Sequence, residues 1–160
     1  MLEWLEMTSY AAWVRESLYG WAIMLTIHAF GNAVVVGVFA IIALRMLGLF
    51  QNTPYTSLKV LIPLVWIGVV TQVVSGFSLF LTKPPRYGTD TLFLIKMAFV
   101  LGGTVVTLQY QKILAQESAA GPKAVASARS VKFGVLCAFL WAGVLVMGRL
   151  TAYLGQLYDV

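Results

Sequence analysis

The sequence contains few of the side chains that usually carry chemistry. Its 160 residues include one histidine, one cysteine and six acidic residues. A single cysteine cannot form a disulfide within the chain or a cysteine-based metal motif, so we expect Cys137, which lies in an apolar segment, to be a small packing residue. We find no serine–histidine–aspartate set, no pair of carboxylates and no phosphate-binding glycine loop, which argues against a hydrolase or a phosphoryl-transfer enzyme.

Charge of either sign is also scarce. Charged residues make up 11% of the chain and hydrophobic residues 60%, whereas soluble domains carry roughly 25% charged residues. The mean hydropathy is +0.86. The net charge of +5 comes from scattered basic residues, which we interpret as loop charges that orient membrane helices rather than as a nucleic-acid surface. The composition predicts an integral membrane protein.

Four apolar segments are each long enough to span a bilayer, which takes roughly 20 helical residues. They cover residues 19–49, 58–82, 91–115 and 131–157. The connections are short, which favours antiparallel neighbours, and the long apolar runs are unlike the alternating segments of a membrane β-barrel. The sequence therefore predicts an all-α fold, an integral membrane four-helix up-down bundle over residues 18–160.

The segment before the first span, residues 1–17, mixes aromatic, apolar and acidic side chains. It begins with Glu3 and Glu6 rather than with the basic residues of a secretory signal. Trp4, Tyr10 and Trp13 are suited to the headgroup level of a bilayer. We expect a short amphipathic helix that lies in the membrane interface.

Basic residues predict the orientation. The loops after the first and third spans carry more of them than the opposite side, which places those loops in the cytoplasm and both termini in the periplasm of a bacterial inner membrane. The cytoplasmic set is Arg45, Lys59, Lys112, Lys123, Arg129 and Lys132, and the opposite set is Arg15, Lys83 and Arg86.

His28 is the principal candidate site residue. It would lie roughly 14 Å inside the first helix, where ionisable side chains are costly and often mark function. One hypothesis is that it is an axial ligand of haem b, held in a helical bundle, with Gly31 leaving room for the macrocycle. The alternative is a packed histidine that bonds to a neighbouring helix, through Gln72, Ser75 or Tyr153.

A second axial ligand is harder to find. Met147 is predicted at the depth of His28, and histidine–methionine ligation is known, although methionines often only fill gaps. Arg149 lies two residues further on and would point about 200° away from Met147. A five-coordinate iron, or one haem shared by His28 of two chains, also remains open.

Lys96 and Arg149 are predicted cations within the outer half of the bilayer. No acidic residue lies in a predicted span, although Glu16 and Asp90 could reach them from the interface. Their anionic partner could be a haem propionate, a lipid phosphate or a carboxylate substrate. Alternatively, both side chains snorkel to the outer headgroups.

Glycine and proline positions predict helix packing. Pro63 should loosen or kink the second helix. The glycines of the four spans have the spacing of close helix contacts. They are Gly31, Gly37, Gly68, Gly76, Gly102, Gly103, Gly143, Gly148 and Gly155.

Two stretches and one short pattern carry a family resemblance. They are LTIHAFGNAVVVGVFAIIALRMLG at 25–48, SGFSLFLTKPPRYGTDTLFLIKMAFV at 75–100, and the Pro63, Trp66, Gly68 pattern. Together they resemble small bacterial inner-membrane proteins akin to the copper-resistance D proteins and the four-helix cytochromes b. The cytochromes use paired histidines on facing helices, and only His28 could match one such position. Copper transport is less favoured, because no methionine, histidine and cysteine cluster has ligand spacing.

Three functional hypotheses follow. The first is a b-type haem-binding membrane anchor or electron-transfer subunit that passes electrons between quinol and a periplasmic partner, with Lys96 or Arg149 neutralising the propionates. The second is a cofactor-free structural subunit of a larger membrane complex. The third is a small transporter or an anion- or lipid-binding membrane protein that uses the side of Lys96 and Arg149. A homo-oligomer is compatible with the first.

Overall fold

The computed structural model describes residues 3–50, 52–121 and 124–157, and of residues 152 and 154–157 only the backbone. Lys123, whose loop charge was counted above, lies outside the described residues. All regular structure in the described residues is helical. In chain order the helices are α1 (Glu3–Glu6), α2 (Ser9–Glu16), α3 (Gly20–Met46), the 3-10 helix η1 (Tyr55–Leu61), α4 (Ile62–Phe80), α5 (Pro84–Thr89), α6 (Thr91–Ser118) and α7 (Ala128–Leu157).

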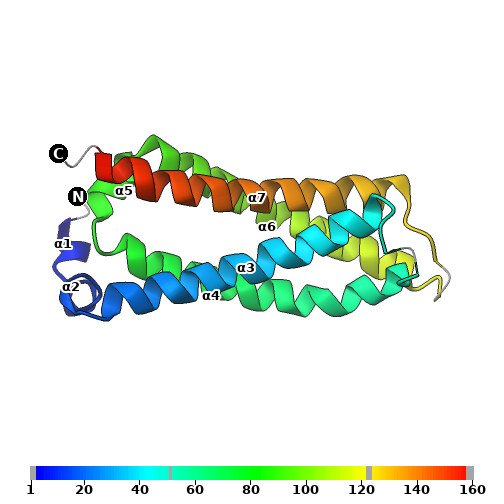
Figure 1. The fold of residues 1–160 in the computed structure, drawn as a ribbon, viewed down its shortest axis with the longest axis horizontal. Coiled ribbons are helices and arrows are strands. Elements are labelled where there is room, and N and C mark those ends of the chain that lie inside the picture. Colours follow the sequence, from blue (N-terminus) through cyan, green and yellow to red (C-terminus); the bar gives the residue numbers. More distant parts are fainter. Residues whose placement is uncertain (1–2, 51, 122–123, 158–160) are drawn as a thin grey trace.

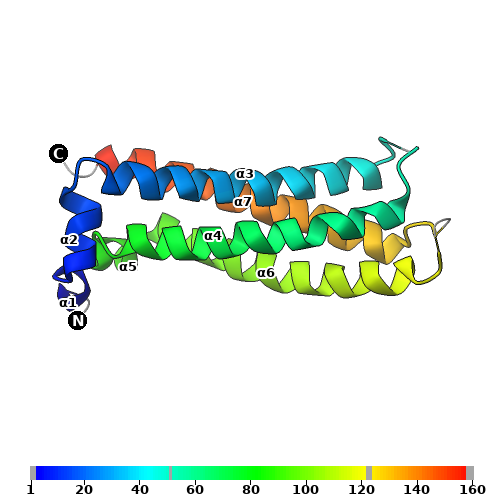
Figure 2. The ribbon, with the colours of Figure 1, turned by 90° about the horizontal axis from the view of Figure 1, so that it is seen from below.

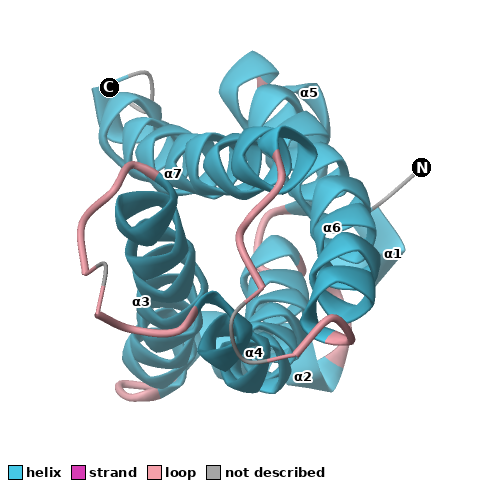
Figure 3. Ribbon diagram, turned by 90° about the vertical axis from the view of Figure 1, so that its right-hand side faces the viewer, coloured by secondary structure: helices cyan, strands magenta, loops and turns pink. Residues whose placement is uncertain are grey.

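Four helical segments are long and apolar enough to cross a membrane: Gly20–Met46, Tyr55–Phe80, Thr91–Ser118 and Ala128–Thr151. The long helices run back and forth along the molecule, and both described ends of the chain lie at the same end of it (Figure 1). Seen end-on, α3, α4, α6 and α7 surround a common axis (Figure 3). Helix α3 packs against α4 and α7, and α6 packs against α7. We call the end next to α2 and α5 the outer end, and the end next to η1 the inner end.

The N-terminal segment forms two short helices rather than one. Thr8 breaks the segment, because its hydroxyl donates to the Leu5 carbonyl at 2.9 Å and accepts from Ala11 N at 3.2 Å. The second contact caps the start of α2. Helix α2 lies across the outer end of the long helices (Figure 2). The Tyr10 hydroxyl is 2.7 Å from Ser78 Oγ on α4 and anchors α2 there.

The second span differs from a single α-helix at its inner end. Its first seven residues form η1, and the α-helical part starts only at Ile62. Pro63 therefore lies in the first turn of α4, where its missing N–H leaves no intrahelical bond unmade. The predicted loosening or kink at Pro63 takes the form of a change from 3-10 helix to α-helix, which occurs at Ile62. The loop expected at 83–90 also contains a helix, α5, which begins with Pro84 and Pro85.

The hydrophobic core occupies the inner half of the bundle. Phe39 of α3, Val65 of α4, Tyr110 of α6 and Trp141 of α7 are among its buried members. Cys137 is also fully buried there, as expected for a packing residue. The outer half holds little of this core, so it has room for the polar residues and the cavities described below.

Glycines mark close contacts, with two exceptions. A Cβ at Gly31 would lie 3.1 Å from the Gly68 carbonyl oxygen, and one at Gly68 would lie 3.1 Å from the Gly31 carbonyl oxygen, so the α3 and α4 backbones approach each other there. A Cβ at Gly37 would meet nothing within 4 Å, and one at Gly102 would only reach Leu140 at 3.9 Å. The prediction of close helix packing at Gly37 and Gly102 is therefore wrong. Gly155 lies where side-chain surroundings are not described.

Candidate functional site

A chain of hydrogen bonds links three helices in the outer half of the bundle. The Ser75 hydroxyl donates to the Thr71 carbonyl at 2.6 Å, so its oxygen is left to accept from His28 Nδ1, which is 3.0 Å away. This assigns the proton of the imidazole to Nδ1. The other ring nitrogen, Nε2, then accepts from Lys96 Nζ at 3.4 Å. Ser75 is fully buried, whereas His28 and Lys96 are half-buried.

Two glycines make room for this pair. A Cβ at Gly76 on α4 would come within 3.1 Å of His28 Cε1. A Cβ at Gly148 on α7 would lie 3.5 Å from both Cε and Nζ of Lys96. The imidazole therefore lies against the backbone of α4, and the lysine side chain lies against the backbone of α7.

A first cavity, of about 460 Å³, opens on the outer side of this pair, and we call it the end cavity. Its volume is within the roughly 300–1,000 Å³ of usual ligand sites. Its walls include Trp21 and the adjoining rings of Phe80, Tyr87 and Phe93, whose centroids lie 5.4 to 6.4 Å apart. Its cationic lining residues are Arg15, Lys83, Arg86 and Lys96. The end cavity thus combines aromatic walls with several basic side chains.

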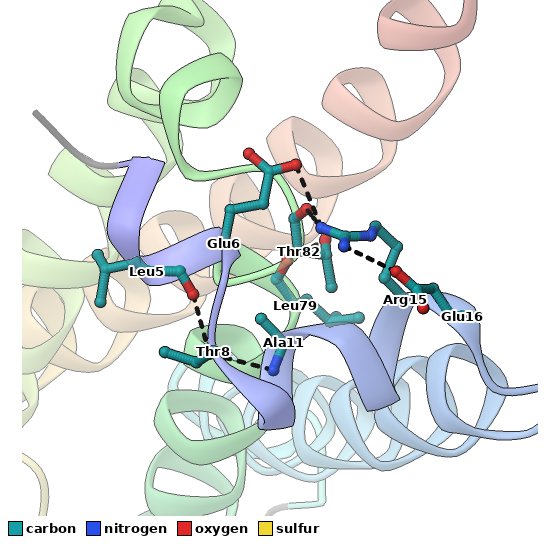
Figure 4. Close-up of polar contacts among 8 residues, drawn as sticks. All are labelled: Leu5, Glu6, Thr8, Ala11, Arg15, Glu16, Leu79 and Thr82. Atoms are coloured by element: carbon teal, nitrogen blue, oxygen red, sulfur yellow. Dashed lines mark hydrogen bonds and ion pairs between the residues drawn. The ribbon is translucent and has the colours of Figure 1, made fainter.

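Arg15 ties the N-terminal helices to the mouth of the end cavity. Its guanidinium forms ion pairs with Glu6 at 3.2 Å and with Glu16 at 2.9 Å, and it also donates to the Thr82 carbonyl at 3.5 Å (Figure 4). Exposed pairs of this kind contribute little to stability. The ion pair with Glu6 joins α2 to α1, whereas the contact with Thr82 holds α2 at the end of α4 and places the guanidinium in the cavity wall.

A second cavity, of about 680 Å³, lies along α3 and α7, and we call it the lateral cavity. It shares Leu25, His28, Lys96 and Gly148 with the end cavity. Its further lining residues come from α3 and α7 and include Asn32, Gly37 and Arg149. The His28–Lys96 pair therefore lies between two cavities of different character.

The candidate residues divide into two groups. The structure brings His28, Lys96 and Arg149 to one cavity, while Met147 lines neither. Gly31 also lies away from both cavities and faces α4, so it does not provide the space expected beside His28. Among the alternatives for a hydrogen-bond partner of His28, Ser75 is the side chain in place.

Glu16 and Asp90, the two carboxylates that could have reached Lys96 and Arg149 from the interface, have other partners. Glu16 pairs with Arg15, and Asp90 caps α6 by accepting from Leu92 N at 2.8 Å. Among the described residues, Lys96 and Arg149 make no ion pair. The positive charge of the site is therefore left for a ligand or for lipid headgroups.

Sequence reasoning missed several residues of the site. The sequence predicts Arg15 in the interfacial helix, away from the site, and it predicts a loop where α5 forms, so it does not indicate the three-ring wall of the end cavity. Asn32 was overlooked, although its position four residues after His28 places both on one face of α3. This four-residue spacing is the sequence feature that points to Asn32.

Comparison with known proteins finds no match among family models, curated proteins or solved structures. The resemblance to copper-resistance D proteins and four-helix cytochromes b rests on the quoted residues alone.

Proposed function

We propose that this chain is a multi-pass protein of the bacterial inner membrane that binds one haem b through His28. The four long apolar helices support insertion in a bilayer. The distribution of lysine and arginine favours an orientation with the inner end in the cytoplasm and both termini in the periplasm. The haem site would then lie in the periplasmic half of the membrane.

The main support is the way His28 is held. Metal-ligating histidines usually donate their second ring nitrogen to a neighbouring group, which fixes the tautomer and the ring orientation. Ser75 accepts from Nδ1 here, so Nε2 carries the lone pair and is the nitrogen available to iron. One histidine can serve as the single protein ligand of a haem iron.

The end cavity suits the rest of the macrocycle. A haem is a flat apolar ring with two carboxylates at one edge, and the aromatic walls and the cationic lining of the end cavity match these two parts. Lys96 must first turn away from Nε2, which its flexible four-carbon stem allows. Lys96, which makes no ion pair among the described residues, is the residue that would neutralise a propionate.

The chemistry of such a group is one-electron transfer. Met147 lines neither cavity, so we propose one protein ligand per iron. Among the described residues, no three histidine, cysteine or acidic side chains come together as a metal-ion site, so haem suits this chain better than a copper ion held by side chains. Electrons would pass between a membrane quinol and a periplasmic partner.

The test is the visible spectrum of purified, detergent-solubilised protein, dithionite-reduced minus air-oxidised. We expect sharp α and Soret bands at one haem per chain when the protein is expressed with ample haem. His28→Gln, which keeps an amide near Ser75, should remove the bands while the protein still inserts. His28→Gly should regain them with added imidazole.

Met147→Leu is the matched control and should keep the full spectrum. Loss of the bands in this variant would indicate histidine–methionine ligation instead. A flat spectrum in the wild type, or an unchanged one in His28→Gln, would refute haem ligation by His28 and would favour a cofactor-free subunit.

A further inference from the structure

We infer that the loop after α3, residues 47–50, inserts its apolar side chains into the headgroup region of an anionic bilayer, while the loop between α6 and α7 stays in water. The inference rests on the proposed membrane insertion and does not depend on haem. We call residues 47–50 the apolar loop, and residues 119–121 and 124–127 the polar loop. Both lie at the inner end of the bundle (Figure 1).

The apolar loop is an ordered continuation of α3. Gly48 follows the last turn of the helix with a φ of 95°, and the Leu49 N–H donates to the Leu44 carbonyl at 3.0 Å, as in a Schellman motif. Phe50 has a φ of 55°, which a bulky residue rarely adopts, and its carbonyl accepts from Thr53 N at 2.9 Å. These bonds fix the course of the loop, so its side chains have a defined place.

The fixed loop exposes large apolar side chains. Leu47 is 66% exposed and Phe50 is 58% exposed, and Leu49 is exposed as well. They continue the exposed apolar surface of α3, to which Ile41 and Leu44 belong. Apolar side chains gain free energy when they leave water. Because the surface of α3 faces lipid in the proposed arrangement, the apolar loop extends the lipid-facing surface beyond the end of the helix.

Two cations flank the apolar loop. Arg45 precedes it and donates from Nε to the Thr53 carbonyl at 3.0 Å, which keeps its charge at the base of the loop. Lys59 on η1 is exposed and lies next to Val60, which is 78% exposed. Apolar side chains beside cations match the boundary between acyl chains and anionic headgroups, where apolar burial and attraction to lipid phosphates act together. A bilayer that contains anionic phospholipid is therefore the partner that this surface fits.

The polar loop presents a different surface at the same end. The sequence from 119 to 127, AAGPKAVAS, contains no aromatic residue and no leucine, isoleucine or methionine. Ser127 Oγ donates to Glu117 Oε1 and so ties the polar loop to the end of α6. The last turns of α6 expose Lys112 and Gln116, at the level where α3 exposes apolar side chains.

The two loops together imply that the bilayer boundary crosses the inner end obliquely. The boundary would pass beyond the end of α3 but before the end of α6. From Lys112 to Ser118, the last part of α6 is about 9 Å long, and this part would stand in water. Such an arrangement corresponds to a tilted bundle, and membrane helices are tilted by about 20° on average.

The experiment measures the accessibility of nitroxide spin labels on the full chain in vesicles of phosphatidylcholine and phosphatidylglycerol. Oxygen concentrates in lipid, whereas the neutral nickel complex of ethylenediaminediacetate stays in water. We expect collisions with oxygen to dominate for Phe50→Cys and collisions with nickel to dominate for the control Val125→Cys, which is 85% exposed in the polar loop. Ile67→Cys, at an exposed position of α4, reports insertion of the bundle itself. Cys137 is buried, and the labelled wild type gives the background.

The role of the anionic lipid is tested with Lys59→Gln in the Phe50→Cys background. We expect the ratio of immersed to water-exposed label to fall about fivefold in vesicles that contain phosphatidylglycerol, which corresponds to about 1 kcal/mol for one cation near an anionic surface. In phosphatidylcholine alone the ratio should not change. Arg129→Gln is the matched control, because Arg129 borders the polar loop and contacts the Phe133 ring; it should leave the ratio unchanged in both kinds of vesicle.

Each contrary result has its own meaning. Nickel dominating at position 50 with oxygen dominating at position 67 would refute insertion of the apolar loop alone, whereas nickel dominating at both would refute membrane insertion as well. Low accessibility to both reagents at position 50 would show that protein covers the loop and would overturn the lipid partner. Equal ratios for Lys59→Gln and Arg129→Gln would refute the anionic headgroup. Folding of each variant is checked by its helical circular dichroism and by a single symmetric peak on size exclusion.

Discussion

Replacing Gly31 by alanine should push α3 and α4 slightly apart. The new Cβ would lie 3.1 Å from the Gly68 carbonyl oxygen and 3.2 Å from both N and Cγ of Gln72. Two of these three neighbours are backbone atoms of α4, so no side-chain rotation can relieve the contact. The helices must move apart by a few tenths of an ångström, within a close-packed contact.

The expected cost follows from comparison with Gly37→Ala on the same helix, where the Cβ meets nothing within 4 Å. Both variants gain up to about 1 kcal/mol of helix propensity when glycine becomes alanine. Only Gly31→Ala also incurs the cost of overpacking, typically about 1–3 kcal/mol. The free energies of unfolding should therefore differ by about 1–3 kcal/mol, with Gly31→Ala the less stable.

The assay is reversible unfolding in mixed micelles with increasing dodecyl sulfate, followed by tryptophan fluorescence. Gly31 also lies three residues after His28, so a wider spacing of α3 and α4 should lengthen the 3.0 Å contact between His28 and Ser75. Equal unfolding free energies for the two variants would refute the close backbone contact of α3 and α4, and with it the account of this interface.

Two further predictions concern the outer end. Asp90→Ala should destabilise the start of α6 by about 1 kcal/mol, because the carboxylate caps two backbone N–H groups there; Asp90→Asn should retain most of the stability, and thermal unfolding distinguishes the two. Tyr10→Phe should loosen α2, because the Tyr10 hydroxyl, 2.7 Å from Ser78 Oγ, is lost. Amide exchange in α2 should become about fivefold faster, as expected for a loss of about 1 kcal/mol, whereas Tyr19→Phe, at an exposed position, should leave it unchanged.

The positions of the long helices could be predicted from the sequence because their apolar runs are long and their boundaries carry polar or glycine signals. The predicted first span, residues 19–49, covers all of α3, and the predicted fourth span, 131–157, starts three residues inside α7. The short helices could not be predicted in this way. Whether Tyr55–Leu61 is 3-10 or α-helical depends on packing against the inner ends of other helices, and α5 contains only six residues.

The candidate site was predictable in composition but not in geometry. The sequence predicts His28 and Lys96 in the outer half of the bundle and gives Ser75 as one possible partner of His28, and the structure shows the three side chains joined by hydrogen bonds. Depth does not give the rotation of a helix about its axis. For that reason the sequence wrongly predicts that Gly31 borders the space beside His28, and it does not give the position of Met147 relative to His28.

The filled inner half and the hollow outer half imply that the four helices are unequally supported along their length. Local opening is easiest where few apolar contacts must be broken. Amide exchange should therefore be slowest around Val35–Ile42 of α3 and Cys137–Val144 of α7 and should increase toward the outer ends. The helices should therefore separate more easily at the outer end of the bundle than at the inner end. Along α3 and α4, the outermost close backbone contact described above is that of Gly31 with Gly68.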